Sequence, residues 1–235
     1  MTPSWLDALQ SSPFFGLCLS LFAYVLGLRI SKRLRTPAAN PMVIAILLLI
    51  AVLYFFRLDF ERYKEGTRFL SALMTPATVA LAIPLYRHIA LLKRHAAAIM
   101  AGILCGVLAN ALGVLGLAVL LDLSHWEFAT LLPKSVTGAV GMALAEELGG
   151  TSALTMTAII VTGLFGNISA SRVCSLFRIE EPIAAGLAIG TASHALGTVR
   201  AFELGEVQGA MSGLAIAVAG VATVLIAPLF AALIP

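Results

Sequence analysis

Seven long uncharged runs constrain this chain more than any other feature. Each is at or near the ~20 apolar residues that an α-helix needs to cross about 30 Å of hydrocarbon. Only 11% of the residues are charged, whereas a soluble domain carries about 25%. The sequence therefore predicts an all-α, polytopic membrane protein with seven or eight transmembrane segments in a single membrane domain, residues 1–235. The runs are Ala8–Leu28, Thr36–Phe56, Phe69–Tyr86, Ala96–Leu121, Leu148–Ser171, Pro182–Val199 and Val207–Pro235.

The basic residues gather in short clusters beside these runs, which indicates orientation in a membrane and not nucleic-acid binding. Arg29–Arg35 holds four cations and no acid, and Arg87–His95 forms a second cluster. The positive-inside rule places both in the cytoplasm and the N-terminus outside. The first ten residues lack the features of a cleaved signal, so we expect them to be retained. The three cysteines have no metal or disulfide spacing.

Two or three of the membrane segments are predicted to be broken or re-entrant. Pro76 and Pro84 fall inside Phe69–Tyr86, and each removes a backbone donor. Leu131–Gly150 has a polar start and a short apolar centre. If Leu131–Gly150 is re-entrant, Arg172–Arg178 and the C-terminus both lie inside; if it spans, there are eight crossings and the C-terminus lies outside. The charge of Arg172–Arg178 favours the first alternative.

Short internal similarities suggest an inverted repeat. The segments PATV and PKSV, which begin at Pro76 and Pro133, share a proline, a hydroxyl and a valine. A different pairing aligns TVALAI with TASHAL. Many transporters are built from repeats whose broken helices meet near the bilayer midplane.

The stretch Gly186–Glu206 concentrates glycines and polar groups within one membrane-sized length. Hydrocarbon penalises each polar group that has no partner, so an ionisable residue at this depth is a functional candidate by default. The pattern is typical of an ion or substrate path. The polar residues are Thr191, Ser193, His194, Thr198, Arg200 and Glu203.

Each candidate also has a structural alternative. His194 is predicted to bind substrate or couple protons, or else to pack against a neighbouring hydroxyl. Arg200 either clamps a carboxylate or pairs with Glu203. Lys134, with Ser135 and Thr137, either forms an anion site at a helix start or reaches towards headgroups. Asn110 is interpreted as a packing residue, and Thr78 as lining a cavity. The predicted substrate-binding residues are Thr78, Lys134, Ser135, Thr137, Thr191, Ser193, His194, Thr198 and Arg200; the coupling candidates are His194 and Glu203; no catalytic, metal or cofactor site is predicted.

The chain carries the motifs PATVALAIPLY (76–86), LLPKSVT (131–137), EELGG (146–150), TG (162–163) and GLAIGTASHALGTVRAFELGE (186–206). Together these motifs resemble the LrgB/CidB family, which includes the plastidial glycolate/glycerate translocator. The resemblance covers the chain from about Asn40 onward. It implies one of two functions: an antiholin-like or holin-like modulator of murein hydrolase export that acts with a small LrgA/CidA-type partner, or a carrier of small 2-hydroxy monocarboxylates.

We predict a secondary transporter of glycolate, glycerate or pyruvate-type monocarboxylates, coupled to protons or cations, in the bacterial cytoplasmic membrane. A regulator that only oligomerises has little need for His194, Arg200 and Lys134 beside broken helices, whereas a carrier needs them. The alternative is the antiholin-like regulator of cell lysis. An enzyme is not expected, because no nucleophile–base pair or phosphate loop is present. The expected partners are a small organic anion, membrane lipid, an LrgA/CidA-type protein and further copies of the chain, but no nucleic acid.

Overall fold

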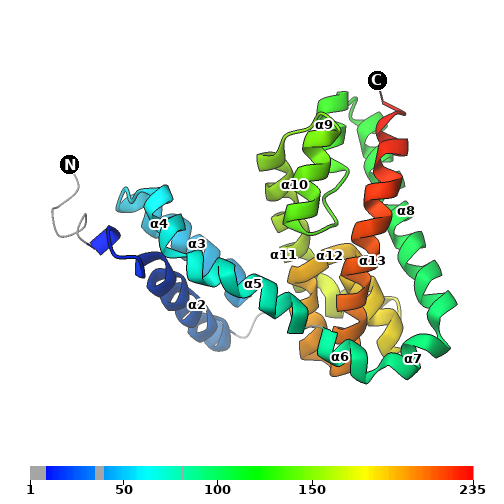
Figure 1. The fold of residues 1–235 in the computed structure, drawn as a ribbon, viewed down its shortest axis with the longest axis horizontal. Coiled ribbons are helices and arrows are strands. Elements are labelled where there is room, and N and C mark those ends of the chain that lie inside the picture. The colour runs from blue at the N-terminus through cyan, green and yellow to red at the C-terminus, as the bar shows by residue number, and fades with distance from the viewer. Residues whose placement is uncertain (1–8, 35–39, 81, 235) are drawn as a thin grey trace. The chain divides into compact units, whose positions relative to one another are not determined.

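The computed structural model describes residues 9–34, 40–80 and 82–234, apart from the side chains of Met74, Thr75 and Thr78. Every regular element in these residues is a helix (Figure 1). The contacts divide the chain into two compact units, residues 1–80 and residues 81–235. The prediction of a single membrane domain stays a prediction.

Unit 1 is built on two helices that pack closely. Its helices are α2 (Phe15–Leu34), α3 (Pro41–Phe55), α4 (Phe60–Gly66) and α5 (Arg68–Ala80). A Cβ on Gly27 would lie only 2.5 Å from the carbonyl oxygen of Pro41, so α2 and α3 touch through backbone. The hydroxyls of Ser20 and Tyr63 lie 2.8 Å apart and join α2 to α4. Of the predicted run Phe69–Tyr86, residues 69–80 belong to α5 and residues 82–86 belong to α6.

Unit 2 has three long helices that run its full length. Its helices are α6 (Ala82–Arg87), α7 (Ile89–Arg94), α8 (Ala96–Leu120), α9 (His125–Leu131), α10 (Gly138–Glu147), α11 (Ser152–Leu176), α12 (Pro182–Leu204) and α13 (Glu206–Ala231). The His125 imidazole bonds the carbonyl oxygens of Leu148 and Ile234, at 3.1 and 2.6 Å, which defines one end of the unit, the His125 end. Arg87 pairs with Glu206 at 3.2 Å at the opposite end, the Arg87 end. Hence α8 and α13 run from the Arg87 end to the His125 end, and α11 runs back (Figure 1).

The helix α12 reverses direction at His194. His194 has φ 41° and ψ −138°, which is not helical. A Cβ on Gly197 would lie 3.1 Å from the carbonyl oxygen of Ile189; in a straight helix these two residues are about 12 Å apart along the axis. Gly190 and Thr198, four residues either side of His194, both contact Ser212 of α13. The first arm, residues 182–193, and the second arm, residues 195–204, therefore lie antiparallel, and both begin or end at the Arg87 end.

The helices α9 and α10 form a second antiparallel pair, which starts from the His125 end. The Trp126 Nε1–H donates to the Thr151 hydroxyl at 2.9 Å, so the chain returns after α10 to the level where α9 began. The turn between them, residues 132–137, reaches the middle of α8, where the Asn110 side chain donates to the Leu132 carbonyl oxygen at 3.3 Å. Unit 2 thus has two turns that reach its interior from opposite ends.

The reversal of α12 corrects the predicted topology. Five described helices are long and apolar enough to cross a membrane, namely α2, α8, α11, α12 and α13. Of these, α12 qualifies by length and composition, yet both its ends lie at the Arg87 end. Arg172–Arg178 therefore lies at the end opposite the C-terminal residues of α13. The prediction that a re-entrant Leu131–Gly150 puts Arg172–Arg178 and the C-terminus on one side is wrong, because it counted α12 as a crossing.

Candidate functional site

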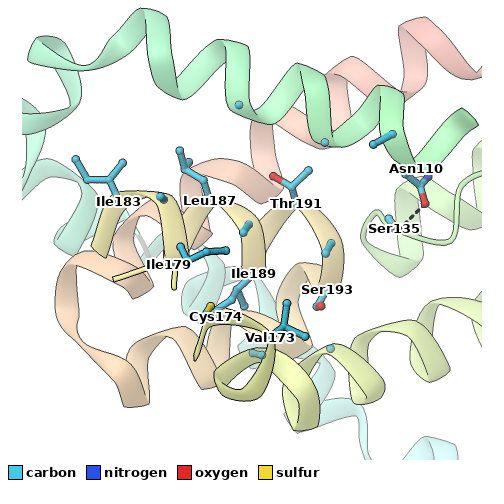
Figure 2. A pocket seen from close by; sticks show the side chains of 18 of the residues that line it. Asn110, Ser135, Val173, Cys174, Ile179, Ile183, Leu187, Ile189, Thr191 and Ser193 are labelled. Carbon is cyan, nitrogen blue, oxygen red and sulfur yellow. Dashed lines mark hydrogen bonds between the residues drawn. The ribbon is translucent and has the colours of Figure 1, made fainter. Parts of the chain in front are cut away.

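A cavity of about 990 Å³ opens between α8, α11 and the first arm of α12 (Figure 2). Along α8 its lining runs from His95 to Asn110, and along α11 from Thr162 to Cys174. These ranges cover the half of unit 2 nearer the Arg87 end. The cavity therefore extends from this end to the middle of the unit, where it meets the turn between α9 and α10.

Lys134 lies at the inner end of the cavity within a ring of hydrogen bonds. Its Nζ donates to Asn110 Oδ1 at 2.6 Å and to Ser135 Oγ at 3.3 Å. The Ser135 hydroxyl in turn donates to Asn110 Oδ1 at 3.0 Å, as the dashed line in Figure 2 marks. Within the described part of the chain, Lys134 forms no ion pair with a carboxylate. The Lys134 side chain is half-buried, and its hydrogen-bond partners Asn110 and Ser135 are neutral. This arrangement favours an anion as a third partner.

The turn of α12 brings two more hydroxyls to the same cavity. Thr191 and Ser193 both line it (Figure 2). The Thr191 hydroxyl is buried and has no hydrogen-bond partner among the described residues. Two glycines make room for this turn: a Cβ on Gly106 would lie 2.7 Å from the Thr191 methyl, and one on Gly166 would overlap the Ser193 hydroxyl. Any side chain at either glycine would push the turn away from α8 or α11.

His194 lies behind the cavity, not in its lining. It is only 3% exposed, and its Nε2 lies 3.0 Å from the carbonyl oxygen of Ile159 in α11. A carbonyl oxygen only accepts, so Nε2 carries the hydrogen in this contact. The positive φ of His194 is rare for a residue with a side chain and carries a strain of about 1–3 kcal/mol. The imidazole therefore ties the turn of α12 to α11 and helps to hold that strained backbone.

The other predicted residues of unit 2 lie outside the lining of the cavity. The Thr198 hydroxyl contacts the His194 carbonyl oxygen and the Ser212 hydroxyl, at 3.0 and 2.7 Å. The Arg200 guanidinium donates to Ser171 at 3.0 and 2.8 Å and pairs with Glu203 at 2.5 Å. Thr137 is the N-cap of α10 but makes no capping hydrogen bond with its side chain.

The structure thus brings together four of the predicted substrate-binding residues. Lys134, Ser135, Thr191 and Ser193 line one cavity. The Thr78 side chain lies outside the described residues.

Sequence reasoning missed the role of Asn110, which was interpreted as a packing residue. Its amide is the common acceptor for Lys134 and Ser135 and also bonds the turn through Leu132. The signal for it was present, since Asn110 is the one strongly polar side chain in the run Ala96–Leu121. Asn167 of α11 is a second amide within a long helix, and it donates to the Leu196 carbonyl oxygen of α12 at 2.7 Å.

Five described helices are long and apolar enough to cross a membrane, which defines a multi-pass helical membrane protein. The chain belongs to the LrgB-like family, whose family model matches residues 20–233, an earlier start than Asn40. It is similar to proteins named "Antiholin-like protein LrgB" from Bacillus cereus and Bacillus anthracis. Each is 34% identical over 220 residues, which cover 93% of this chain and 96% of the relative. No solved structure matches the chain. The protein is a multi-pass bacterial membrane protein.

Proposed function

We propose that this protein is a secondary carrier of small monocarboxylates, which bind through their carboxylate to Lys134. The observation that carries the proposal is the Lys134 ammonium group, which has no counter-ion among the residues that the structure describes. It lies at the inner end of a cavity, midway along apolar helices. A charge at membrane depth is expensive and marks a substrate or ion pathway by default. A carboxylate would supply the missing counter-charge through charge-assisted hydrogen bonds.

The surroundings of Lys134 support a small ligand with one carboxylate and a second polar group. Ser135, Thr191 and Ser193 add hydroxyls at the same end of the cavity. The backbone N–H groups at the start of α10 add positive potential near the turn, since Thr137 does not cap them with its side chain. Much of the remaining lining is apolar and leaves little to bind a large polar ligand. Glycolate, glycerate and pyruvate fit this description.

The two antiparallel helix pairs support transport by alternating access. We propose that the α9–α10 pair and α12 are re-entrant elements of an inverted repeat, as in carriers whose broken helices meet at the midplane. Their turns approach α8 one helical turn apart, at Asn110 and at Gly106. With α3 and the α5–α6 segment as further crossings, the predicted total of seven or eight segments remains our proposal.

The charges of unit 2 support a cavity that opens to the cytoplasm. The Arg87 end carries Arg87, Lys93 and Arg94 just before α8, which the positive-inside rule puts in the cytoplasm. The cavity mouth, at His95 and Glu181, lies at the same end. The His125 end would then face outwards. Opening towards that side would require the α9–α10 turn to move away from α8.

His194 and Glu203 remain our candidates for coupling, and Arg200 remains a candidate for substrate binding. Each is engaged in the conformation seen here, His194 by Ile159 and Arg200 by Ser171 and Glu203. We propose that these bonds exchange during transport. Substitution of His194 or Arg200 by Ala should then abolish uptake while the protein stays folded.

A second candidate function is supported by the name of the relatives, which are called antiholin-like. In that function the protein would regulate lysis together with an LrgA/CidA-type membrane protein, and oligomers would form through its lipid-facing helices. A regulator of this kind needs no ligand in the cavity, so substitution of Lys134 would leave it active.

The test is uptake of labelled glycolate, pyruvate and lactate into proteoliposomes that contain the purified protein, with and without an inward proton gradient. Wild-type protein should show saturable uptake, and Lys134→Met should lose it. Lys93→Met is the matched control, because Lys93 lies at the Arg87 end outside the cavity lining, and it should transport normally. If folded wild-type protein moves none of these anions, alone or with an LrgA-type partner, the carrier proposal is wrong and the regulatory function is favoured.

A further inference from the structure

Asn110 accepts a hydrogen bond from Lys134 through an uncharged amide. An aspartate has the same shape, but in this position it would neutralise the ammonium group. Its Oδ1 accepts from the Lys134 ammonium at 2.6 Å and from the Ser135 hydroxyl at 3.0 Å, and its Nδ2 donates to the Leu132 carbonyl oxygen. These bonds determine the orientation of the amide, because an ammonium group can only donate. Lys134 donates to Asn110 and Ser135, which leaves the third of its three N–H groups for another partner.

We propose that Asn110 is a positioning residue: it directs the Lys134 amine to the inner end of the cavity and, being uncharged, leaves its charge for one ligand carboxylate. The identity of the ligand rests on the proposed function. The other titratable residues of the lining are His95 and Glu181 at the mouth and Cys174 of α11. The inner end therefore offers one positive charge, which suits a monoanion. A second carboxylate would be buried there without a counter-charge, at considerable cost.

A purely structural role for Asn110 makes a different prediction. In that case the amide only fastens the turn at residues 132–137 to α8 through Leu132, and the charge of Lys134 is irrelevant to it. Asp at position 110 would then destabilise the protein by the same amount whether or not Lys134 is present. If Asn110 faces an uncompensated ammonium group, Asp is tolerated much better when Lys134 is there, since the two charges pair.

The first arm of the experiment needs no ligand. Apparent Tm is measured in detergent for wild type, Asn110→Asp, Lys134→Met and the double variant. We expect Asn110→Asp to lower Tm by several degrees more in the Lys134→Met background than in wild type. Asn167→Asp is the matched control, because Asn167 is also an amide within a membrane helix but bonds Leu196 of α12. Its effect should be the same in both backgrounds.

The second arm separates KM from the maximal rate in proteoliposomes. Asn110→Asp should raise the KM for glycolate by about tenfold or more, the effect expected when a ligand loses one hydrogen bond to a charged group. It should do so in protein that is as stable as wild type.

Each outcome decides one point. An equal penalty for Asp in both backgrounds overturns the inference, whatever wild type transports. The inference is also overturned if Asn110→Asp lowers Tm more in the Lys134→Met background than in wild type, but has the same KM for glycolate as wild type. A coupled penalty in a protein whose wild type moves no carboxylate refutes the proposed function and the ligand assignment with it, but supports Asn110 as the neutral partner of Lys134.

Discussion

The reversal of α12 can be tested with a single methyl group at Gly197. In a straight helix, Gly197 would be an interior glycine, and its replacement by Ala would stabilise the protein by about 0.5–1 kcal/mol. In the folded-back helix, that Cβ would lie 2.5 Å from the Ser193 Cβ and 3.1 Å from the Ile189 carbonyl oxygen. Both distances are shorter than van der Waals contact, so the two arms would have to move apart.

The expected change in the free energy of unfolding is the cost of the added methyl group less the gain in helix propensity. An extra methyl in a packed interior typically costs about 1–3 kcal/mol, and the gain in helix propensity offsets up to about 1 kcal/mol of that. We expect a net destabilisation of about 1–2 kcal/mol for Gly197→Ala. In a domain of this size, that corresponds to a fall in Tm of roughly 2–8 °C.

The assay is thermal unfolding of the purified protein in detergent, followed by the fraction that remains monodisperse. Gly113→Ala is the control of opposite sign, because a Cβ on Gly113 of α8 meets no atom within 4 Å. It should raise Tm slightly. If Gly197→Ala raises Tm as Gly113→Ala does, then the arms of α12 do not pack against each other and the reversal at His194 is refuted.

Three further predictions follow from named contacts. Thr191→Val should raise Tm, because a methyl replaces a buried hydroxyl that has no hydrogen-bond partner within the described ranges of the chain; uptake should fall at the same time if that hydroxyl contacts the ligand. A cysteine at Glu147 should react with a membrane-impermeant maleimide in intact cells, while one at Arg178 should react only after permeabilisation, since these residues lie at opposite ends of unit 2; equal labelling of both would refute the arrangement. Hydrogen bonds from the Ser124 side chain and backbone hold the pKa of Glu127 below its usual value. These hydrogen bonds therefore stabilise the folded protein fully when the pH is above the pKa of Glu in the unfolded chain, about 4.3. Their contribution is lost as the pH falls through the lower pKa of Glu127 in the folded protein. The difference in Tm between wild type and Ser124→Ala should therefore be constant above about pH 5 and shrink in more acidic solution.

Some features of the site could be read from the sequence because they depend on residue type alone. Lys134, Thr191 and Ser193 are polar groups in apolar surroundings, and such groups have to face a cavity or a partner wherever the chain folds. Asn110 carried the same signal. Its role was missed because its partners are 24 and 25 residues away, and only the turn between α9 and α10 brings them together.

Arg200 shows the opposite case. Its charge in an apolar stretch suggested either a carboxylate clamp or a pair with Glu203, and the structure has the pair with Glu203. It adds hydrogen bonds to Ser171, which lies on α11, so no local pattern could have revealed the contact with Ser171.

The uncharged runs by themselves determined that the chain is a helical membrane protein, because burying a helical backbone in lipid depends only on length and hydropathy. The path of α12 was decided by tertiary structure alone. A straight and a reversed helix of residues 182–204 have the same composition. The reversal is held by contacts that the local sequence does not specify: the His194 imidazole on Ile159, Gly166 against Ser193, and Gly190 and Thr198 on Ser212. These contacts offset the strain at His194, and together they place the turn of α12 beside the cavity.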